Sequence, residues 1–319
     1  MTQCLNAMAS KRGERAYQQF TKVQSRIIEE LGGMDTASDF VVDDWIRTEG
    51  GGGRTCVIQG GDLIEKGGVN VSRVYGQMSE AFSAQVPGDG RQFFATGVSL
   101  IIHPKNPHVP TVHANFRYIE KGEGEGARSW FGGGADLTPW ILYDEDASHF
   151  HRTWKTVCGR HEIGDFDKMK KWCDEYFYLP HRGETRGVGG IFYDYLSLGD
   201  HPKGTPGSIE EAEAFTFDAS DSFLSAYTPI VERRKDLEWS ESERKWQLVR
   251  RGRYVEFNLI YDRGTTFGLK TGGRVESILV SLPNPVSWEY VKLFLKYLSN
   301  FLALAKASTF SSKKFRENI

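Results

Sequence analysis

Cysteine is scarce in this chain: its 319 residues include four, Cys4, Cys56, Cys158 and Cys173. No two of them have CxxC spacing, which excludes a disulfide framework and a thiolate metal site as organising features. We therefore expect the protein to work in a reducing compartment.

Charge of one sign is also missing, because 40 Lys and Arg residues nearly balance 42 Asp and Glu residues. The formal net charge of −2 provides no basic field that would draw the chain to nucleic acid or to anionic lipid. We expect no nucleic-acid partner.

Long apolar runs are absent from the N-terminal stretch MTQCLNAMASKRGERAY, so it does not resemble a secretory signal. Glu14 and the uneven placing of arginine also disfavour a transit peptide, and a cytoplasmic location is expected. The stretch from Trp288 to about Ser308 is apolar and helical in pattern, but Lys292 and Lys296 interrupt it. We predict a packed or dimer-forming helix there and no transmembrane segment.

Internal repeats and proline- or serine-rich linkers are missing too. We therefore predict one domain over residues 1–319, with 291–319 as an atypical helix or tail. The chain is rich in aromatic residues, which make up 13% of it. Aromatic side chains fill cores more often than pockets, and a large apolar pocket is the alternative interpretation.

Turn and capping signals divide the chain into short elements. The Gly50–Gly53 run lacks the Gly-Lys-Ser/Thr of a phosphate loop, and we interpret it as a turn between strands. Ser208 with Glu211 and Ser240 with Glu243 fit the capping-box pattern. We predict helices over Arg15–Glu30 with a stop at Gly32 and Gly33, after Asp144, over Asp165–Tyr176, after Ser208, and over Ser240–Arg251 with a stop at Gly252.

The strand-like segments follow one another as hairpin neighbours and not in regular βαβ alternation. This order favours an α+β fold, with a large antiparallel β-sheet sandwiched between helices. The predicted strands are Phe94–His103, Thr111–Ile119, Ser129–Phe131, Gly189–Tyr195, Arg253–Tyr261 and Val275–Leu282.

Polar residues of unusual type alternate along Thr111–Ile119. His113, Asn115 and Arg117 fall on one face of the predicted strand, and the residues between them are apolar or aromatic. In the preceding strand Ser99 and His103 share a face. If the two strands form a hairpin, these five polar groups line one surface; a solvated face with incidental histidines is the other interpretation.

Such a surface suits an acidic organic ligand. Arg117 can bind a carboxylate through two parallel hydrogen bonds, and His113 can move a proton near neutral pH. The segment Trp130–Asp136 brings a carboxylate into a glycine-rich bend, although Asp136 can equally be a helix cap. Gly272, Gly273 and Arg274 can present amides and a guanidinium to a second carboxylate, or form an ordinary hairpin turn with a surface arginine.

The histidines leave a metal site open as a possibility. His149 and His151 are two positions apart, so they cannot share a helix face, and an HExxH-type zinc site is excluded. His103, His113, His151 and His181 can together supply ligands to a divalent metal, but their spacing supports no particular geometry.

Four long stretches carry more specific information. They are GVSLIIHPKNPHVPTVHANFRY (97–118), WFGGGADLTPWILYDEDASHFH (130–151), KKWCDEYFYLPHRGETRGVGGIFYD (170–194) and RRGRYVEFNLIYDRGTTFGLKTGGRVESILVSLP (250–283). Together they resemble the oxygen-dependent coproporphyrinogen III oxidase family, and the resemblance runs from about Gly50 to Tyr290.

The resemblance implies an enzyme of heme biosynthesis. It implies oxidative decarboxylation of two propionate side chains of coproporphyrinogen III to vinyl groups, giving protoporphyrinogen IX. Molecular oxygen is the co-substrate, CO2 and H2O2 are released, and no organic cofactor is needed. The family also implies a homodimer on a flat antiparallel sheet between helices, with a contact resembling the Tyr254–Glu289 region.

Residue roles follow by position in the matched motifs. The resemblance implies His113 as the proton donor, with Asp136 and Arg117 as further catalytic residues. In bacterial members the metal-ligand positions match His103, His113, His151 and His181, and other members work without a metal. The substrate-binding residues implied are Ser99, Asn115, Phe116, Arg117, Arg186, Gly272, Gly273 and Arg274.

One stretch departs from the family pattern. After Tyr290 the family continues with an acidic, polar tail, whereas here residues 291–319 are apolar and then basic. This departure bears on the dimer contact and not on the chemistry. Two other functions stay open: a metal-dependent hydrolase built on the histidines, and a tetrapyrrole carrier that leaves the propionates intact.

Overall fold

The computed structural model describes residues 9–270 and 273–289. Within them, one antiparallel sheet of seven strands has the order β1-β2-β3-β4-β5-β6-β9, and β7 and β8 form a separate hairpin. The strands are β1 (Asp39–Ile46), β2 (Gly51–Gln59), β3 (Ile64–Gln77), β4 (Gln92–Pro104), β5 (Thr111–Lys121), β6 (Arg128–Thr138), β7 (Tyr178–Leu179), β8 (Glu184–Thr185) and β9 (Gly189–Leu196).

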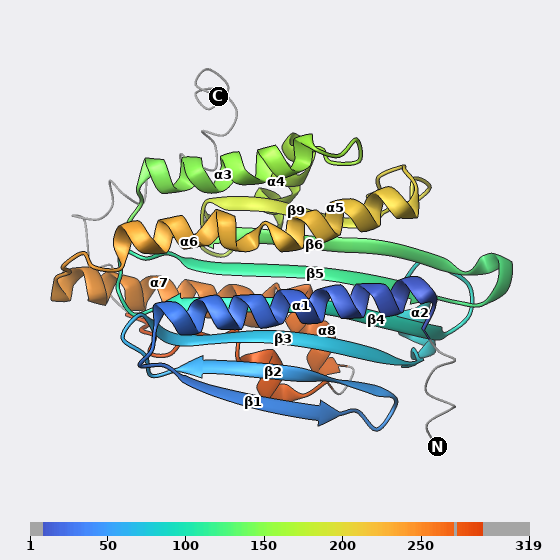
Figure 1. The fold of residues 1–319 in the computed structure, drawn as a ribbon, viewed down its shortest axis with the longest axis horizontal. Helices are drawn as coiled ribbons and strands as arrows, with labels where there is room; N and C mark the ends of the chain where they lie inside the picture. Colours follow the sequence, from blue (N-terminus) through green and yellow to red (C-terminus); the bar gives the residue numbers. More distant parts are fainter. Residues whose placement is uncertain (1–8, 271–272, 290–319) are drawn as a thin grey trace.

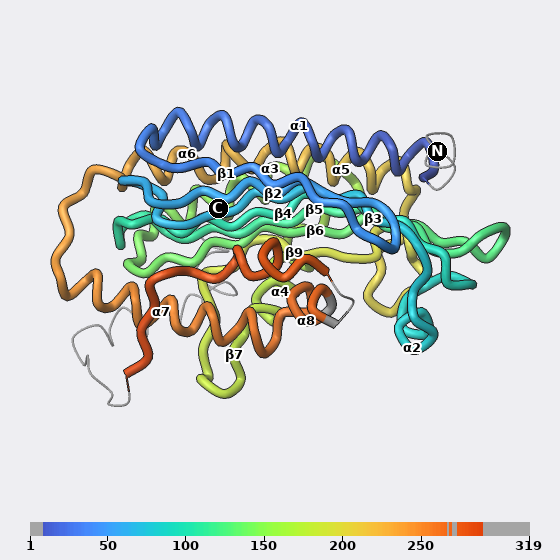
Figure 2. The backbone as a smooth tube through the Cα atoms, turned by 90° about the horizontal axis from the view of Figure 1, so that it is seen from below, coloured from blue at the N-terminus to red at the C-terminus, as the bar shows by residue number. Residues whose placement is uncertain are grey.

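Helices cover both faces of this sheet. In Figure 2, α1, α5 and α6 lie along one face, and α7 and α8 lie along the other, whereas Figure 1 shows α3 and α4 beside β9. The predicted α+β sandwich is confirmed. The helices are α1 (Lys11–Met34), α2 (Glu80–Ser83), α3 (Asp144–Gly159), α4 (Phe166–Tyr176), α5 (Ile209–Asp221), α6 (Phe223–Arg234), α7 (Glu241–Ile260), α8 (Arg263–Lys270) and α9 (Val275–Leu279), with a 3-10 turn at Gly124–Gly126.

The main core lies between the sheet and the α1 layer. Leu100 of β4 and Ala114 of β5 are register partners, and both side chains are buried there. They share one hydrophobic cluster with Phe20 of α1 and Phe215 of α5. The predicted alternation of apolar and polar side chains along β4 and β5 is therefore confirmed, because the apolar side chains of both strands point into this core.

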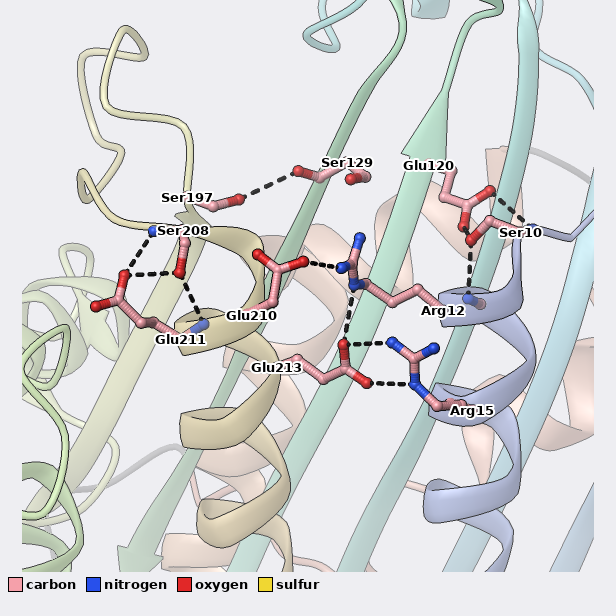
Figure 3. A network of polar contacts seen from close by, with 11 residues as sticks. Ser10, Arg12, Arg15, Glu120, Ser129, Ser197, Ser208, Glu210, Glu211 and Glu213 are labelled. Atoms are coloured by element: carbon pink, nitrogen blue, oxygen red, sulfur yellow. Dashed lines mark hydrogen bonds and ion pairs between the residues drawn. The ribbon is translucent and has the colours of Figure 1, made fainter.

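Ion pairs hold α1 against α5, although the two helices are far apart in sequence (Figure 3). The Nε atoms of Arg12 and Arg15 each lie 2.9 Å from an oxygen of Glu213, and Arg12 also pairs with Glu210. Only 12% of the Glu213 side chain is exposed. This network fastens the first helix over the sheet, on the face opposite α7.

The predicted strand Arg253–Tyr261 is wrong, because α7 continues through it to Ile260. Tyr254 and Phe257 are buried three positions apart, which is helical spacing. The predicted helix stop at Gly252 is wrong as well. A Cβ at Gly252 would lie 2.7 Å from the Ser287 carbonyl oxygen, so this glycine permits a close approach of chain segments.

Other boundaries also differ from the prediction. The predicted strand Val275–Leu282 is helix α9 followed by a turn. Gly32 and Gly33 lie inside α1, which ends at Met34. The predicted glycine-rich bend after Trp130 is extended strand β6, which also excludes Asp136 as a helix cap.

Several predictions of local structure are confirmed. Helices α3 and α4 begin at Asp144 and Phe166, and both capping boxes, at Ser208 and Ser240, are present. Strands β1 to β3 were not predicted as such, since their sequences are rich in glycine and charged residues.

Most of the predicted C-terminal helix lies beyond residue 289, the last residue that the structure describes. Trp288 and Glu289 lie outside any helix, and the remainder of the predicted helix and the whole 291–319 tail lie outside the described residues. Among the described helices, none combines the length and the apolar character that crossing a membrane requires.

Candidate active site

The five polar groups predicted on β4 and β5 do share one face of the sheet. Ser99 is the register partner of Asn115, and residues two apart in a strand point the same way. His103 is therefore on the same side as Ser99, and His113 and Arg117 are on the same side as Asn115. This face looks toward the α7 layer, because the opposite face is occupied by the core.

Small residues surround these groups on neighbouring strands. Neighbouring strands are about 4.8 Å apart, so five of them form a surface roughly 19 Å wide. The segment around α9 covers the β2–β3 end of this surface, where Thr55 is 2% exposed and bonds Ser277, so room for a ligand remains over β4 to β6. One row across the sheet contains Thr55, Asn70, Ser99, Asn115 and Gly134, and the next contains Gly53, Ser72, Gly97, Arg117 and Gly132.

His113 forms a hydrogen-bonded pair with Asp136, its register partner on β6. The Nδ1 atom of His113 lies 2.8 Å from Oδ1 of Asp136. The Asp136 side chain is 2% exposed and that of His113 is 27% exposed. Since Nδ1 bonds the carboxylate, Nε2 is the ring nitrogen available to a ligand on the sheet face.

Arg186, in the loop between β8 and β9, completes this arrangement. Its Nη2 donates to Oδ2 of Asp136 at 2.6 Å, and its Nη1 donates to Asn258 of α7 at 3.0 Å. The guanidinium carbon lies 4.0 Å from the ring centre of Phe177 and 4.2 Å from that of Tyr254. The Arg186 guanidinium is thus fixed in orientation by its charge-assisted hydrogen bond to Asp136 and by its packing on the two aromatic rings.

The protonation state of the pair follows from its surroundings. Burial on its own raises the pKa of Asp136, but the nearby Arg186 and His113 outweigh burial and hold that pKa below its ordinary value. Burial likewise opposes charge on Arg186, and Asp136 outweighs it, so the pKa of Arg186 is raised. Asp136 is therefore an ionised carboxylate that orients His113.

Arg117 is held by two neighbours. Its Nη1 donates to Oδ1 of Asn115 at 3.0 Å, and its Nη2 donates to Oδ2 of Asp194 at 2.7 Å. Burial lowers the pKa of Arg117, but Asp194 outweighs this effect and the pKa is raised. The Arg117 side chain remains 27% exposed, so guanidinium donors remain for a ligand carboxylate.

The segment around α9 lies over the β1–β3 part of the same face. Arg274 pairs with Asp43 of β1 and keeps 39% of its side chain exposed. The carbonyl of Ser277 accepts a hydrogen bond from Asn70 at 3.1 Å. Gly273 lies between two helices and not in a hairpin turn, and its amide donates to the Gly268 carbonyl; Gly272 lies outside the described residues.

The position of Phe116 differs from the prediction that it binds substrate. Its side chain is 0% exposed and belongs to the main core, on the face opposite His113. The alternation that places Asn115 and Arg117 toward the ligand face turns Phe116 away from it. The substrate-binding role predicted for its side chain is not supported by this geometry.

The structure does not assemble the predicted four-histidine metal site. His103 is buried, with Nε2 2.9 Å from the Ser281 carbonyl, and His151 of α3 directs Nε2 to the Val188 carbonyl at 3.1 Å. His181 bonds Tyr261 and Glu256. Within residues 9–270 and 273–289, no group of three or more His, Cys, Asp or Glu side chains is arranged to hold a metal ion, so the residues present do not fit a metal.

Sequence reasoning missed the residues that hold the site from outside the two strands. Asp194 and Asn258 each anchor a site arginine, and Phe177 and Tyr254 pack on Arg186. Asp194 is an acid within an otherwise apolar strand, and that is the only signal that the sequence offered. Asn258, Phe177 and Tyr254 reach the site only because α7 and the end of α4 pack beside Arg186 in the fold.

The fold and the site together define a class of protein. It has one antiparallel sheet whose first face is buried under helices, and whose second face carries a histidine and an arginine that are each held by a carboxylate. The family model described as "Coproporphyrinogen III oxidase" matches residues 15–296. The chain belongs to this family.

Curated relatives agree with that assignment. Proteins named oxygen-dependent coproporphyrinogen-III oxidase are 49% identical over 281 residues in Mus musculus and 50% identical over 262 residues in Drosophila melanogaster. These matches cover 85% and 79% of this chain, but only 62% and 65% of the relatives. The chain thus spans a little less than two thirds of the length of the curated relatives it matches.

The names of the relatives also correct one expectation. The Mus musculus protein, and a Rattus norvegicus protein that is 48% identical over 281 residues (85% of this chain and 62% of the relative), are both named as mitochondrial. The predicted cytoplasmic location is therefore wrong. Composition and the N-terminal stretch were a poor basis for it.

Proposed function

We propose that this chain catalyses the oxygen-dependent oxidative decarboxylation of coproporphyrinogen III to protoporphyrinogen IX, a step of heme biosynthesis. Two propionate side chains become vinyl groups. For each, a hydrogen leaves the ring-side carbon with its electron pair, and the bond to the carboxylate carbon breaks to give CO2 and the vinyl double bond. Oxygen takes up that hydrogen, its electron pair and one proton as H2O2.

The observation that carries this proposal is the flat polar face beside the His113–Asp136–Arg186 chain. Its small residues leave room for a large macrocycle beside His113, and its arginines can pair with the carboxylate groups of such a substrate. Family membership supplies the substrate class and the oxygen. No organic cofactor enters the proposal, because the electron-rich pyrrole itself reacts with oxygen.

The geometry of the polar face supports the residue roles that we propose. His113 gives or takes a proton through Nε2, because Nδ1 is held by the ionised Asp136. Arg117 and Arg274 bind carboxylates, and Ser99 and Asn115 contact the ligand from the sheet. Arg186 is engaged with Asp136 and Asn258, so we assign it to holding Asp136 and not to direct contact with the substrate.

The decisive experiment compares aerobic and anaerobic incubation with coproporphyrinogen III. We expect vinyl product, CO2 and H2O2 in the presence of oxygen and no vinyl product without it. Turnover without oxygen would overturn the proposal, and so would binding without any turnover, which would instead favour a carrier. Hydrolysis that is lost on chelation would favour the metal-dependent hydrolase.

We propose in addition that the chain forms a homodimer through the region of Tyr254–Glu289. In support, large apolar side chains are exposed there among the described residues: Leu259, Ile260, Val275 and Trp288 are 48–57% exposed. Light scattering should give twice the chain mass. A monomer at micromolar concentration would exclude the dimer, and Ile260→Asp should dissociate it if this surface is the contact.

A further inference from the structure

Strand β9 carries one extra residue opposite the site. Asp194 and Tyr195 of β9 together oppose the single residue Gly132 of β6, which makes a β-bulge. Tyr195 has φ +56°, a left-handed conformation that is uncommon for a residue other than glycine. Bulges of this kind redirect a side chain, and here the redirected side chain is that of Asp194.

The bulge determines where the Asp194 carboxylate lies. Its Oδ1 accepts a hydrogen bond from the Tyr195 amide at 3.1 Å, and its Oδ2 accepts from Nη2 of Arg117 at 2.7 Å. The Asp194 side chain is 9% exposed. Both oxygens are therefore engaged, and the carboxylate is fixed relative to the strand.

Gly132 provides the room for this pair. A Cβ at Gly132 would lie 2.5 Å from Oδ1 of Asp194 and 3.0 Å from Nη2 of Arg117. No side chain fits there without displacing the carboxylate or the guanidinium. The bulge and the missing Cβ thus act together on one ion pair.

Arg117 is consequently held at both amino groups, by Asp194 on one side and Asn115 on the other. A guanidinium has five N–H donors, so three remain. We propose that Asp194, placed by the bulge, is a positioning residue that fixes Arg117 to receive a carboxylate group of the substrate on the polar face. This inference rests on the proposed function for the identity of the substrate.

The test uses Asp194→Asn, which keeps the shape of the side chain and removes its charge. With coproporphyrinogen III and oxygen, we expect KM to rise at least tenfold while kcat changes less than threefold, because Arg117 binds a carboxylate away from the reacting proton. Gly132→Ala, which leaves the carboxylate in the chain but displaces it, should raise KM in the same way.

Glu213→Gln is the matched control. Glu213 is similarly buried and pairs with two arginines, but on the opposite face of the sheet (Figure 3). The KM of the Glu213→Gln variant should stay within twofold of that of the unmodified protein. In an Arg117→Ala background, Asp194→Asn should raise KM no further, because Asp194 acts through Arg117.

An unchanged KM in Asp194→Asn, or an equal further rise in the Arg117→Ala background, would overturn the role of Asp194. The proposed function is tested separately, by turnover in the unmodified protein. If that protein does not turn over, binding of coproporphyrin III, followed by tryptophan fluorescence, decides the role of Asp194. A tenfold loss of affinity in Asp194→Asn supports it, and an unchanged affinity rejects it.

Discussion

Nδ1 of His113 and Oδ1 of Asp136 lie 2.8 Å apart across two neighbouring strands. Because Asp136 is ionised and also accepts from Arg186, it can only accept from His113. The proton on Nδ1 is thereby fixed, and proton exchange with a ligand is left to Nε2.

Replacing His113 tests this assignment. We expect His113→Ala to lower kcat by about 10²–10⁴-fold, the usual contribution of a general acid or base. Steady-state kinetics with coproporphyrinogen III provides the measurement. His149→Ala is the control, since His149 is a partly exposed residue that bonds the Ser225 carbonyl outside the site. A decrease of less than tenfold for His113→Ala would show that His113 moves no proton in the slow step.

Breaking the buried pair should destabilise the fold. Asp136→Asn leaves the Arg186 guanidinium without its charged partner in a site where its side chain is 3% exposed. We expect a loss of about 3–5 kcal/mol in the free energy of unfolding at pH 7, measured by urea denaturation. Asp44→Asn, which breaks an exposed pair with Arg54, should change stability little.

The same pair predicts a pH dependence. The pKa of Asp136 is lowered in the folded state, so its stabilisation is complete above the ordinary value of 3.8 and is lost as the pH falls through the folded value. The difference in unfolding free energy between the unmodified protein and Asp136→Asn should therefore narrow below about pH 4. A difference independent of pH would show that the charge of Asp136 does not contribute.

His151 should give the protein a sensitivity to acid at higher pH. Burial, with a smaller contribution from Lys170, lowers the pKa of His151 from 6.5 to about 3. Below about pH 6.5, His151 is therefore protonated in the unfolded chain but stays neutral in the folded chain. This difference lowers the free energy of unfolding by about 2 kcal/mol at pH 5. His151→Gln should lose that much less stability between pH 7 and pH 5, by urea denaturation at each pH. An equal loss in both proteins would contradict the assignment.

A glycine within α7 should resist substitution. Alanine normally favours a helix by about 1 kcal/mol over glycine. At Gly252, however, the new Cβ would lie 2.7 Å from the Ser287 carbonyl oxygen, and overpacking costs about 1–3 kcal/mol. We expect Gly252→Ala to lower the free energy of unfolding in urea. Gly33→Ala in α1, where the same Cβ meets no atom within 4 Å, should be tolerated.

Strand alternation was readable from the sequence because its period is local. Ser99 and Asn115 were assigned to one surface from parity and a short loop, and the register confirms it. Capping boxes at Ser208 and Ser240 were equally readable, since each depends on two residues three positions apart. The C-terminal half of α7 was not readable, because its aromatic and β-branched residues favour strands until packing against the sheet overrides that preference.

By itself, the sequence determined the class of fold, the face that carries His113, Asn115 and Arg117, and the family. The tertiary structure alone decided which groups hold those side chains. Asp136 meets His113 across strands, whereas Arg186 and Asp194 reach the site from a loop and from a bulge. The three contacts join residues 23, 50 and 77 positions apart, and no local pattern encodes them. Long-range contacts also explain why the predicted metal site is not formed. The four histidines predicted as ligands each bond a different set of partners in the fold.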